Sequence, residues 1–551
     1  MKFNFLLVFI CFTVSTNAQF ETNITSSQLD TIIFKAGQQS TQPGAAVIIL
    51  KDDSIVYFNA TGLANIKHSK PIELQTQFNI GSVTKMFTAT AILLLEESGK
   101  LNRNDDIRKY IPEAPITEKV ITINNLLSHT AGIRTHFELA QFLFNYKKKL
   151  AYFPLMINYI NDYNELSFET GENFAYSNTG YMLLAMIIEK ASGQTYSEYI
   201  TENIFIPLGM HNTYVSAGKV KYLNDGTASY RIKDNGKTKK PYFYIDATGA
   251  TGINSTLYDI FLWDKNFYNN KLGKGSANLI DAFTTSFTLN NGTSVHYGCG
   301  VILKKYRLKL VAEHSGGWGE YLFQYRRFPD EHISILAWNN ASNYSPFVTV
   351  DKISNAIFNF GDDVHQNIDI LPAFNQALLT GTYITANNFI REVKLINDTL
   401  VLQLPLNQSS RHHPLIFTGP VNDSIIQYID TAGNVIKFQK NGATITGFSW
   451  AGGEYFVAER YYEKINESAA IEPQMLSGKY YLENHKNKIK ITFNKRKQSY
   501  YLSPFPFYHF KMEHVTGNIF HLAHYDYYIR VEENSLIMGD DWIFNMHFIK
   551  K

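Results

Sequence analysis

The sequence predicts an α+β fold that is followed by one or two small antiparallel β modules. Strand patterns occur at 44–59 and again at 308–338, with helical patterns between them, so the sheet would be built from distant parts of the chain. After about residue 365 the helical periodicity fades and short aromatic strands take over. The 551 residues exceed one compact domain, so we expect two or three domains.

The composition excludes some classes of partner. Hydrophobic residues make up 45% and charged residues 18% of the chain, as in folded water-soluble proteins. Lys plus Arg (51) nearly balance Asp plus Glu (49), so the chain has no excess positive charge to neutralise a phosphate backbone. We therefore expect no nucleic acid as a partner. Nothing in the sequence sets the oligomeric state.

Residues 1–18 have the layout of a signal peptide. Lys2 provides the charged start, an apolar run covers 3–12, and small or polar residues lead to Ala18. The alternatives are a buried strand or a membrane anchor, but this apolar run is too short to cross a bilayer, and no other stretch is apolar enough. We expect an exported protein, periplasmic or secreted, without stable membrane insertion.

The two cysteines lie far apart. Cys11 falls inside the predicted signal peptide and Cys299 in the mature chain, which then cannot form an internal disulfide.

The expected elements follow from hydrophobic periodicity and turn residues. An apolar run followed by a turn and an alternating run predicts a hairpin. Two amphipathic stretches that end at glycines predict helices. Alternating runs typical of strands then return. In chain order these are strands at 44–50 and 54–59, helices at 82–98 and 179–191, and strands at 308–313, 321–326 and 333–338. The expected domain limits are 19–365, 375–463 and 475–551.

A weak internal repeat supports two β modules rather than one. The pattern Leu-x-Gly-x-Tyr occurs at Leu379-Thr380-Gly381-Thr382-Tyr383 and at Leu476-Ser477-Gly478-Lys479-Tyr480, each time before a run of strands, with a linker expected at 466–474. The alternative is a single β domain in which the short pattern recurs by chance.

Ser82 and Lys85 are the first candidates for chemistry. They lie three residues apart at the expected start of the first helix, so their side chains would share one face. The N-H groups of the first helical turn lack internal partners and would stabilise an oxyanion formed when Ser82 attacks a carbonyl. Burial among apolar neighbours would favour a neutral Lys85 that acts as a base. The alternative is an N-cap serine with a solvated lysine.

Two later motifs give this pair a context. Tyr176-Ser177-Asn178 precedes the second helix, and His314-Ser315-Gly316-Gly317 ends a strand. The order Ser-x-x-Lys, Tyr-x-Asn and His-x-Gly resembles the serine β-lactamase and penicillin-binding-protein superfamily, particularly its class C-like branch with D-alanyl-D-alanine carboxypeptidases, esterases and D-aminopeptidases. The resemblance covers roughly residues 30 to 360 and extends to Leu126 to Gly132, Pro207 to Met210 and Gly252 to Thr256.

The resemblance implies roles for individual residues. Ser82 would be the nucleophile that forms an acyl-enzyme, with Lys85 and Tyr176 as the proton-handling pair. Asn178, His314, Gly316 and Gly317 would bind the substrate, with an oxyanion hole at the backbone N-H groups of Ser82 and Gly317.

His314 departs from the lysine that many members carry, and a neutral histidine attracts a carboxylate less than a lysine does. The resemblance therefore implies a serine hydrolase for small-molecule or short-peptide substrates, with an ester, amide or small peptide bond preferred to penicillins. The alternative is a catalytically silent sensor or binding protein with the same fold.

Signals for other chemistry do not occur. The sequence has no His-Glu-x-x-His run, paired cysteine spacing, Walker loop or Gly-x-Gly-x-x-Gly after a strand, so we expect neither a metal nor a cofactor. His129, within Ser128-His129-Thr130-Ala131-Gly132, is expected to be a structural residue at a helix-ending turn, with a triad base as the alternative.

Overall fold

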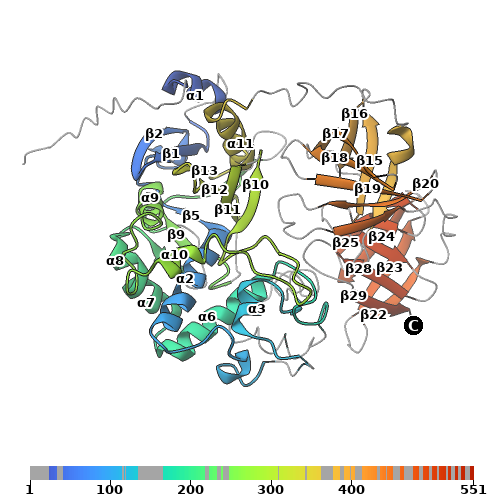
Figure 1. The fold of residues 1–551 in the computed structure, drawn as a ribbon, viewed down its shortest axis with the longest axis horizontal. Coiled ribbons are helices and arrows are strands. Elements are labelled where there is room, and N and C mark those ends of the chain that lie inside the picture. The colour runs from blue at the N-terminus through green and yellow to red at the C-terminus, as the bar shows by residue number, and fades with distance from the viewer. Residues whose placement is uncertain are drawn as a thin grey trace, which may run out of the picture.

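The computed structural model describes most of the N-terminal two thirds of the chain and a series of strands in the rest (Figure 1). The described residues are 24–33, 41–114, 117, 119–134, 160, 166–216, 223–232, 238–239, 247–307, 309–341, 344–360, 376–384, 390–396, 399–403, 413–422, 424–430, 435–441, 444–450, 460–464, 476–482, 488–494, 499–505, 508–516, 519–522, 528–531, 535–539 and 546–550. In these residues we find no helix with the length and apolar character needed to span a bilayer.

A six-stranded antiparallel sheet forms the centre of the N-terminal part, in the order β10-β11-β12-β13-β1-β2. The first two strands of the chain thus join one sheet with four strands that come more than 200 residues later in the sequence, as predicted, and β1 pairs with β13. The strands are β1 (Ala45–Lys51), β2 (Ser54–Thr61), β10 (Ile302–Tyr306), β11 (Lys309–Trp318), β12 (Tyr321–Phe328) and β13 (Ile333–Asn339). This arrangement confirms the predicted α+β class.

Helices cover both faces of this sheet. On one face, α11 packs on β12 and β13 and also contacts α1. On the other face, α2 packs against α6 within the larger of the two buried apolar cores of this part. The helices are α1 (Ser26–Ile33), α2 (Thr84–Glu97), α3 (Ile123–Leu127), α6 (Asn178–Ser192), α7 (Tyr196–Ile200), α8 (Ile206–Leu208), α9 (Leu257–Lys265), α10 (Ala277–Asp281) and α11 (Pro346–Ile357). Shorter turns are the 3-10 segments η1 (Gly81–Val83), η2 (Ile107–Lys109) and η4 (Gln376–Leu379), and the π-helical turn η3 (Thr201–Phe205).

Strand β1 is apolar from Ala45 to Leu50, and both of its faces are buried there. Ile48 and Leu50 point into the larger core with α2, while Val47 and Ile49 join the side chains of α1 and α11 on the opposite face. Alternate side chains of a strand point to opposite faces, so a strand between two helical layers needs an unbroken apolar run.

Three small sheets complete the N-terminal part. β9 lies between β5 and β6, and it connects the segment before η1 to the middle of the chain. The strands are β3 (Leu63–Asn65), β4 (Lys70–Pro71), β5 (Phe78–Asn79), β6 (Tyr214–Val215), β7 (Arg231–Ile232), β8 (Thr238–Lys239) and β9 (Ile253–Ser255).

The first helix starts later in the structure than the sequence predicts. It begins as the 3-10 turn η1, and regular α-helix starts only at Thr84. The second predicted helix is present as α6, and it ends at the left-handed Gly193 (φ 77°), whose N-H donates to the carbonyl of Glu189. Glycine adopts this conformation without the steric cost of a Cβ atom, which makes it a common helix end.

Two closed antiparallel barrels of eight strands form the C-terminal part. The first barrel contains β14 (Gly381–Ile384), β15 (Ile390–Ile396), β16 (Thr399–Gln403), β17 (His413–Asn422), β18 (Ile425–Asp430), β19 (Val435–Asn441), β20 (Thr444–Trp450) and β21 (Arg460–Lys464). The second contains β22 (Gly478–Leu482), β23 (Lys488–Asn494), β24 (Ser499–Phe505), β25 (Tyr508–Thr516), β26 (Ile519–Leu522), β27 (Tyr528–Val531), β28 (Ser535–Gly539) and β29 (Met546–Lys550). Eight strands enclose only enough room for side chains, and buried apolar groups occupy both interiors.

The repeated Leu-x-Gly-x-Tyr pattern has the same structure in both barrels. The hydroxyl of Tyr383 donates to the carbonyl of Leu379 at 2.5 Å, and that of Tyr480 donates to the carbonyl of Leu476 at 2.9 Å. All four residues are buried. The pattern therefore fixes the entry of the chain into each barrel.

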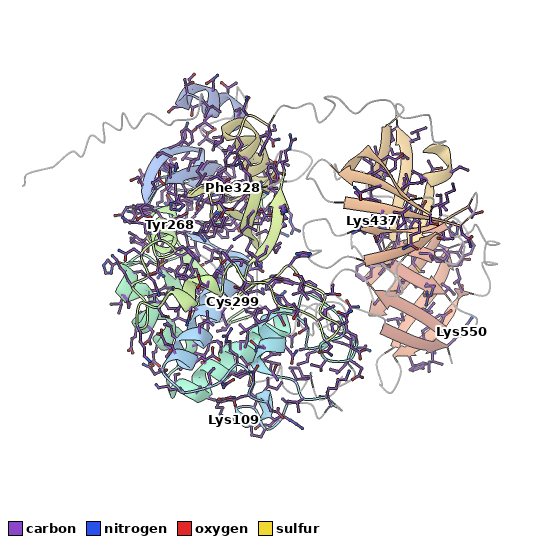
Figure 2. All side chains as sticks on the ribbon, viewed as in Figure 1. Lys109, Tyr268, Cys299, Phe328, Lys437 and Lys550 are labelled. Atoms are coloured by element: carbon purple, nitrogen blue, oxygen red, sulfur yellow. The ribbon has the colours of Figure 1, made fainter. Side chains whose placement is uncertain are left out.

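Several predicted features lie outside the described residues. These are the signal peptide at 1–18 with Cys11, the linker at 466–474 and the domain limits at 365, 375 and 475, all of which stay predictions. Cys299 lies inside the N-terminal part (Figure 2), and burial raises the pKa of its thiol to about 12.

Candidate active site

Ser82 lies at the point where the 3-10 turn η1 meets strand β11. Gly81 adopts the left-handed conformation (φ 53°), and a Cβ atom on it would lie 2.3 Å from the backbone nitrogen of Gly317. A Cβ atom on Gly316 would lie 2.0 Å from the carbonyl oxygen of Ile80. Because real Cβ atoms do not approach other atoms this closely, only glycine at these positions lets the two segments come together. The sequence thus brings Ser82 beside the backbone of Gly317.

Lys85 is fully buried one turn further along. Its Nζ atom donates to Asn178 Oδ1 at 2.7 Å, to the carbonyl oxygen of Ala250 at 3.0 Å and to Ser82 Oγ at 3.2 Å. These contacts contradict the alternative of a solvated surface lysine. They put the amine within proton-transfer distance of the serine hydroxyl.

Tyr176 and Asn178 approach Lys85 from the segment that leads into α6. The Lys85 Nζ atom lies 4.7 Å from the centre of the Tyr176 ring. Ser177 caps the helix, because its Oγ atom accepts from the N-H of Gly180 at 3.2 Å. The predicted residues Ser82, Lys85, Tyr176 and Asn178 therefore come together, with the Asn178 amide oxygen in contact with Lys85.

The third of the three sequence motifs, His314 to Gly317, lies on the part of β11 that extends beyond its neighbour β10. Pairing with β10 stops at Glu313, whereas pairing with β12 continues to Trp318. Among the described strands, none therefore pairs with the far half of β11 on the side of β10. The backbone of Gly316 and Gly317 lies on this half, next to η1.

His314 is buried and neutral. Its Nδ1 atom donates to the carbonyl oxygen of Ser315 at 2.6 Å, so Nε2 accepts from the hydroxyl of Tyr297 at 3.2 Å. Burial, followed by the charge of Lys85, lowers the pKa of His314 from 6.5 to about 3. Both ring nitrogens are thus occupied within the protein, and the predicted contact of His314 with a substrate stays a prediction.

A chain of buried amides supports the backbone before Ser82. Asn254 Nδ2 donates to Ser216 Oγ, Asn79 Nδ2 donates to Asn254 Oδ1 at 2.9 Å, and the N-H of Gly81 donates to Asn79 Oδ1 at 2.9 Å. Sequence reasoning missed Asn79 altogether. It noted Asn254 only as part of a family-like segment, because 175 residues separate the two amides.

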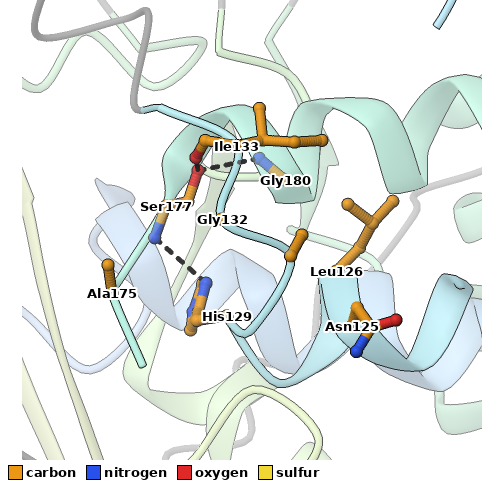
Figure 3. A pocket seen from close by; sticks show the side chains of 9 residues that line it. Asn125, Leu126, His129, Gly132, Ile133, Ala175, Ser177 and Gly180 are labelled. Atoms are coloured by element: carbon orange, nitrogen blue, oxygen red, sulfur yellow. Dashed lines mark hydrogen bonds between the residues drawn. The ribbon is translucent and has the colours of Figure 1, made fainter. Parts of the chain in front are cut away.

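A small pocket is lined in part by Ala175 and Ser177, the two neighbours of Tyr176 (Figure 3). Its volume is about 10 Å³, the room that one water molecule needs. This pocket is therefore too small for a substrate. Its lining consists of Asn125, Leu126, His129, Ala131, Gly132, Ile133, Ala175, Ser177 and Gly180.

His129 is not bonded to Ser82. Its Nδ1 atom accepts from the backbone N-H of Ser177 at 3.0 Å, and Nε2 has no hydrogen-bond partner among the described residues. This geometry favours the structural role over the triad base. No group of three or more acidic, histidine or cysteine side chains that could hold a metal ion occurs in the described part of the chain.

Comparisons with known proteins agree on one family. The Beta-lactamase family profile matches residues 29–351. Penicillin-binding protein 4* of Bacillus subtilis is 31% identical over 324 residues, which are 56% of this chain and 70% of that protein. Protein flp of Staphylococcus aureus is 31% identical over 248 residues, 44% of this chain and 49% of that protein, so the chain spans about half the length of this relative.

A solved structure extends the likeness in fold. The octameric penicillin-binding protein homologue from Pyrococcus abyssi superimposes with a TM-score of 0.53 at 24% identity, covering 80% of this chain and all of that one. Residues 29–351 contain every predicted site residue, and they make up more than half of the chain. The chain therefore belongs to the Beta-lactamase family.

Proposed function

We propose that this protein is a serine hydrolase that forms an acyl-enzyme on Ser82. The observation that carries the proposal is the position of the Lys85 Nζ atom, 3.2 Å from Ser82 Oγ and fully buried. The start of η1 and the backbone of Gly317 also lie side by side, which supports an oxyanion site formed by the N-H groups of Ser82 and Gly317.

The reaction begins when Ser82 Oγ attacks the carbonyl carbon of the substrate. With Lys85 or Tyr176 deprotonated beforehand, the serine proton passes to this pair, and the carbonyl electrons move onto the oxygen that the N-H groups of Ser82 and Gly317 stabilise. The bond to the leaving group then breaks, and the leaving group takes up the proton. A water molecule attacks the acyl-enzyme by the same route and releases the acid and free Ser82.

The substrate class follows from the charges near the site. Lys85 already donates to three acceptors, and His314 is neutral above its pKa of about 3. The third motif therefore contributes no fixed positive charge that would favour a free carboxylate. We propose short acyl esters, amides or small peptides as substrates, in preference to penicillins.

The open half of β11 supports peptide-like substrates in particular. An extended substrate can hydrogen-bond to the free edge of a strand. Gly316 and Gly317 lie on the half of β11 with which no described strand pairs on the side of β10, and this supports an extended substrate there.

Intact-mass analysis with a fluorophosphonate probe and, separately, with a penicillin tests the proposal. We expect one fluorophosphonate adduct per chain, which the Ser82→Ala variant does not form. Fast turnover of a short acyl ester with weak hydrolysis of penicillin would support the substrate class, and the reverse ranking would contradict it. An acyl adduct that persists without product release would favour a penicillin-binding sensor, and the absence of any adduct would exclude the acyl-enzyme.

We also propose that the protein is exported, to the periplasm or the medium. The charged start, apolar run and Ala18 at the end of 1–18 support this. The N-terminal sequence of the protein recovered from cells tests it, with the cleavage site expected after Ala18.

A further inference from the structure

His129 lies in a strained turn between α3 and the segment that carries Tyr176. It follows the end of α3 by two residues and adopts the left-handed conformation with φ 59°. Residues other than glycine enter this region at a cost of about 1 kcal/mol or more, and such strain is retained where the surrounding structure demands it. The turn is fully buried.

His129 accepts two hydrogen bonds from the residues on either side of Tyr176. The backbone N-H of Ala175 donates to the carbonyl oxygen of His129 at 3.0 Å. On the other side of Tyr176, the backbone N-H of Ser177 donates to His129 Nδ1 at 3.0 Å (Figure 3). A single residue thus holds the main chain immediately before and immediately after Tyr176.

The ring of His129 also packs directly on the candidate catalytic tyrosine. Its centre lies 4.4 Å from that of Tyr176, 4.7 Å from that of Tyr297 and 5.0 Å from that of Tyr181. Because close-packed rings cannot shift independently, this contact restricts the Tyr176 ring as well as its backbone.

The hydrogen bond from Ser177 requires one form of the imidazole. A nitrogen that accepts an N-H cannot carry a proton, so the proton of the neutral ring lies on Nε2. Burial, followed by the charge of Lys85, lowers the pKa of His129 well below 6.5, which keeps the ring neutral. A doubly protonated ring would turn Nδ1 into a donor and oppose the N-H of Ser177.

We propose that His129 is the positioning residue of the site, which uses its carbonyl oxygen, Nδ1 atom and ring face to hold Tyr176 against Lys85 and to set the start of α6 at Asn178. The inference rests on the proposed function, because it assigns a role to the neighbour of a candidate catalytic residue. The described side-chain hydrogen bond of His129 goes to Ser177 and not to Ser82, so its effect passes through Tyr176 and Asn178.

The variants His129→Asn and His129→Leu separate positioning from packing. The two side chains have nearly the same shape, but only Asn offers an acceptor where Nδ1 lies. We expect His129→Leu to lower the rate constant of fluorophosphonate acylation about 10- to 100-fold per folded molecule, because small displacements in a catalytic site are costly. His129→Asn should restore most of this loss. The pH-rate profile should shift in the Leu variant alone, since proton transfer depends on the distance between Tyr176 and Lys85.

His332→Leu is the matched control for backbone strain. His332 adopts a similar left-handed conformation (φ 52°) in an exposed turn. This variant should lower the melting temperature without changing acylation. Equal acylation rates in His129→Asn and His129→Leu, or an unshifted pH-rate profile in His129→Leu, would overturn the positioning role.

The tautomer provides a readout that does not depend on hydrolysis. In long-range ¹H-¹⁵N spectra of histidine-labelled protein, the signal that disappears in His129→Asn should show a proton on Nε2 and an unprotonated Nδ1. A proton on Nδ1 would overturn the inference even if the Leu variant does not fold. If the unmodified protein forms no adduct but shows this tautomer, then the proposed function fails while the placement of Tyr176 by His129 stands.

Discussion

His314 shows how burial decides what a histidine in this site can do. The side chain occupies a motif position where the resemblance implies contact with a substrate, but both of its nitrogens bond to protein groups. A neutral, fully bonded imidazole contributes hydrogen bonds and shape to the site and no positive charge.

The first prediction concerns acid stability. The pKa of His314 lies below its ordinary 6.5, at about 3, so the unfolded chain binds a proton first as the pH falls. The stability that the neutral ring contributes is fully present above pH 6.5 and decreases toward pH 3. The free energy of unfolding should therefore fall by about 1 to 2 kcal/mol more between pH 7 and pH 5 in the unmodified protein than in His314→Gln.

Urea unfolding at both pH values measures this difference. Burial also lowers the pKa of His129, but His129 is present in both proteins, so its contribution to the pH dependence cancels in the comparison. Equal acid sensitivity of the two proteins would show that His314 is not held neutral by burial.

The second prediction concerns the amide chain before Ser82. Asn79→Leu keeps the shape of the side chain but leaves the N-H of Gly81 and the Oδ1 atom of Asn254 without their partner. An unsatisfied buried group costs about 1 to 3 kcal/mol. We expect acylation per folded molecule to fall about 10-fold or more, because η1 loses its fixed position.

Asn340→Leu is a suitable control for this variant. Asn340 is equally buried, but it donates to the carbonyl oxygens of Leu63 and Ala228 and accepts from Gly44 rather than supporting η1. Its substitution should lower stability and leave acylation per folded molecule nearly unchanged. A similar loss of acylation in both variants would assign the effect to general destabilisation.

At the scale of elements, the contact between η1 and β11 builds the candidate oxyanion site. The contact depends on Gly316 far more than on its neighbour Gly317. A Cβ atom on Gly316 would meet the carbonyl of Ile80 at 2.0 Å, whereas one on Gly317 would only reach the Leu322 side chain at 3.6 Å, an ordinary contact.

The third prediction uses this difference. Gly316→Ala should push η1 away from β11 and lower the acylation rate constant about 100-fold. Gly317→Ala keeps the backbone N-H, so its acylation rate constant should fall much less. Acylation kinetics with the fluorophosphonate probe compare the two variants, and equal losses would contradict the role of the close approach.

The sequence predicted the local elements better than their assembly. Ser82 and Lys85 were recognisable because three residues of helix bring them together, and the sheet was recognisable from alternating strands. The partnership of Asn79 with Asn254 was not, because it forms between two strands far apart in the sequence that pair only in the fold. The close approach of Gly316 to Ile80 was equally hidden, since no spacing in the sequence reports a contact between a turn and a strand.

The barrels show the same limit. The repeat predicted that two modules were possible, and the hydrogen bond from each tyrosine explains why the pattern recurs. Closure could not be predicted, because it depends on pairing between the first and last strand of each barrel, β14 with β21 and β22 with β29.

At the scale of the whole molecule, the first barrel shares a buried cluster with the N-terminal part. Ala175, the neighbour of Tyr176, belongs to the cluster formed by the interior of this barrel, and Phe168 packs against it. Among the described residues, the buried cluster inside the second barrel contains no residue from the N-terminal part.

The fourth prediction follows from this difference. A chain that ends within 465–475 keeps the first barrel and should acylate Ser82 within about 3-fold of the full chain, whereas a chain that ends within 361–375 exposes Ala175 and should be about 10-fold slower. Both are compared by fluorophosphonate kinetics on the folded fraction. Equal rates in the two truncated chains would show that the first barrel does not affect Tyr176.

The pairing of the first strand with the last strand closes each barrel, and it bears on how a chain with two such barrels can evolve. Tyr383 pairs with Lys464 where the first barrel closes, and Tyr480 pairs with Lys550 where the second closes, so each barrel receives and releases the polypeptide at the same end. A module with adjacent entry and exit can be copied or removed at the level of the gene while its neighbours keep their own ends in place. The two barrels in this chain, with their matching first strands, have the form that a tandem duplication of such a cassette would leave.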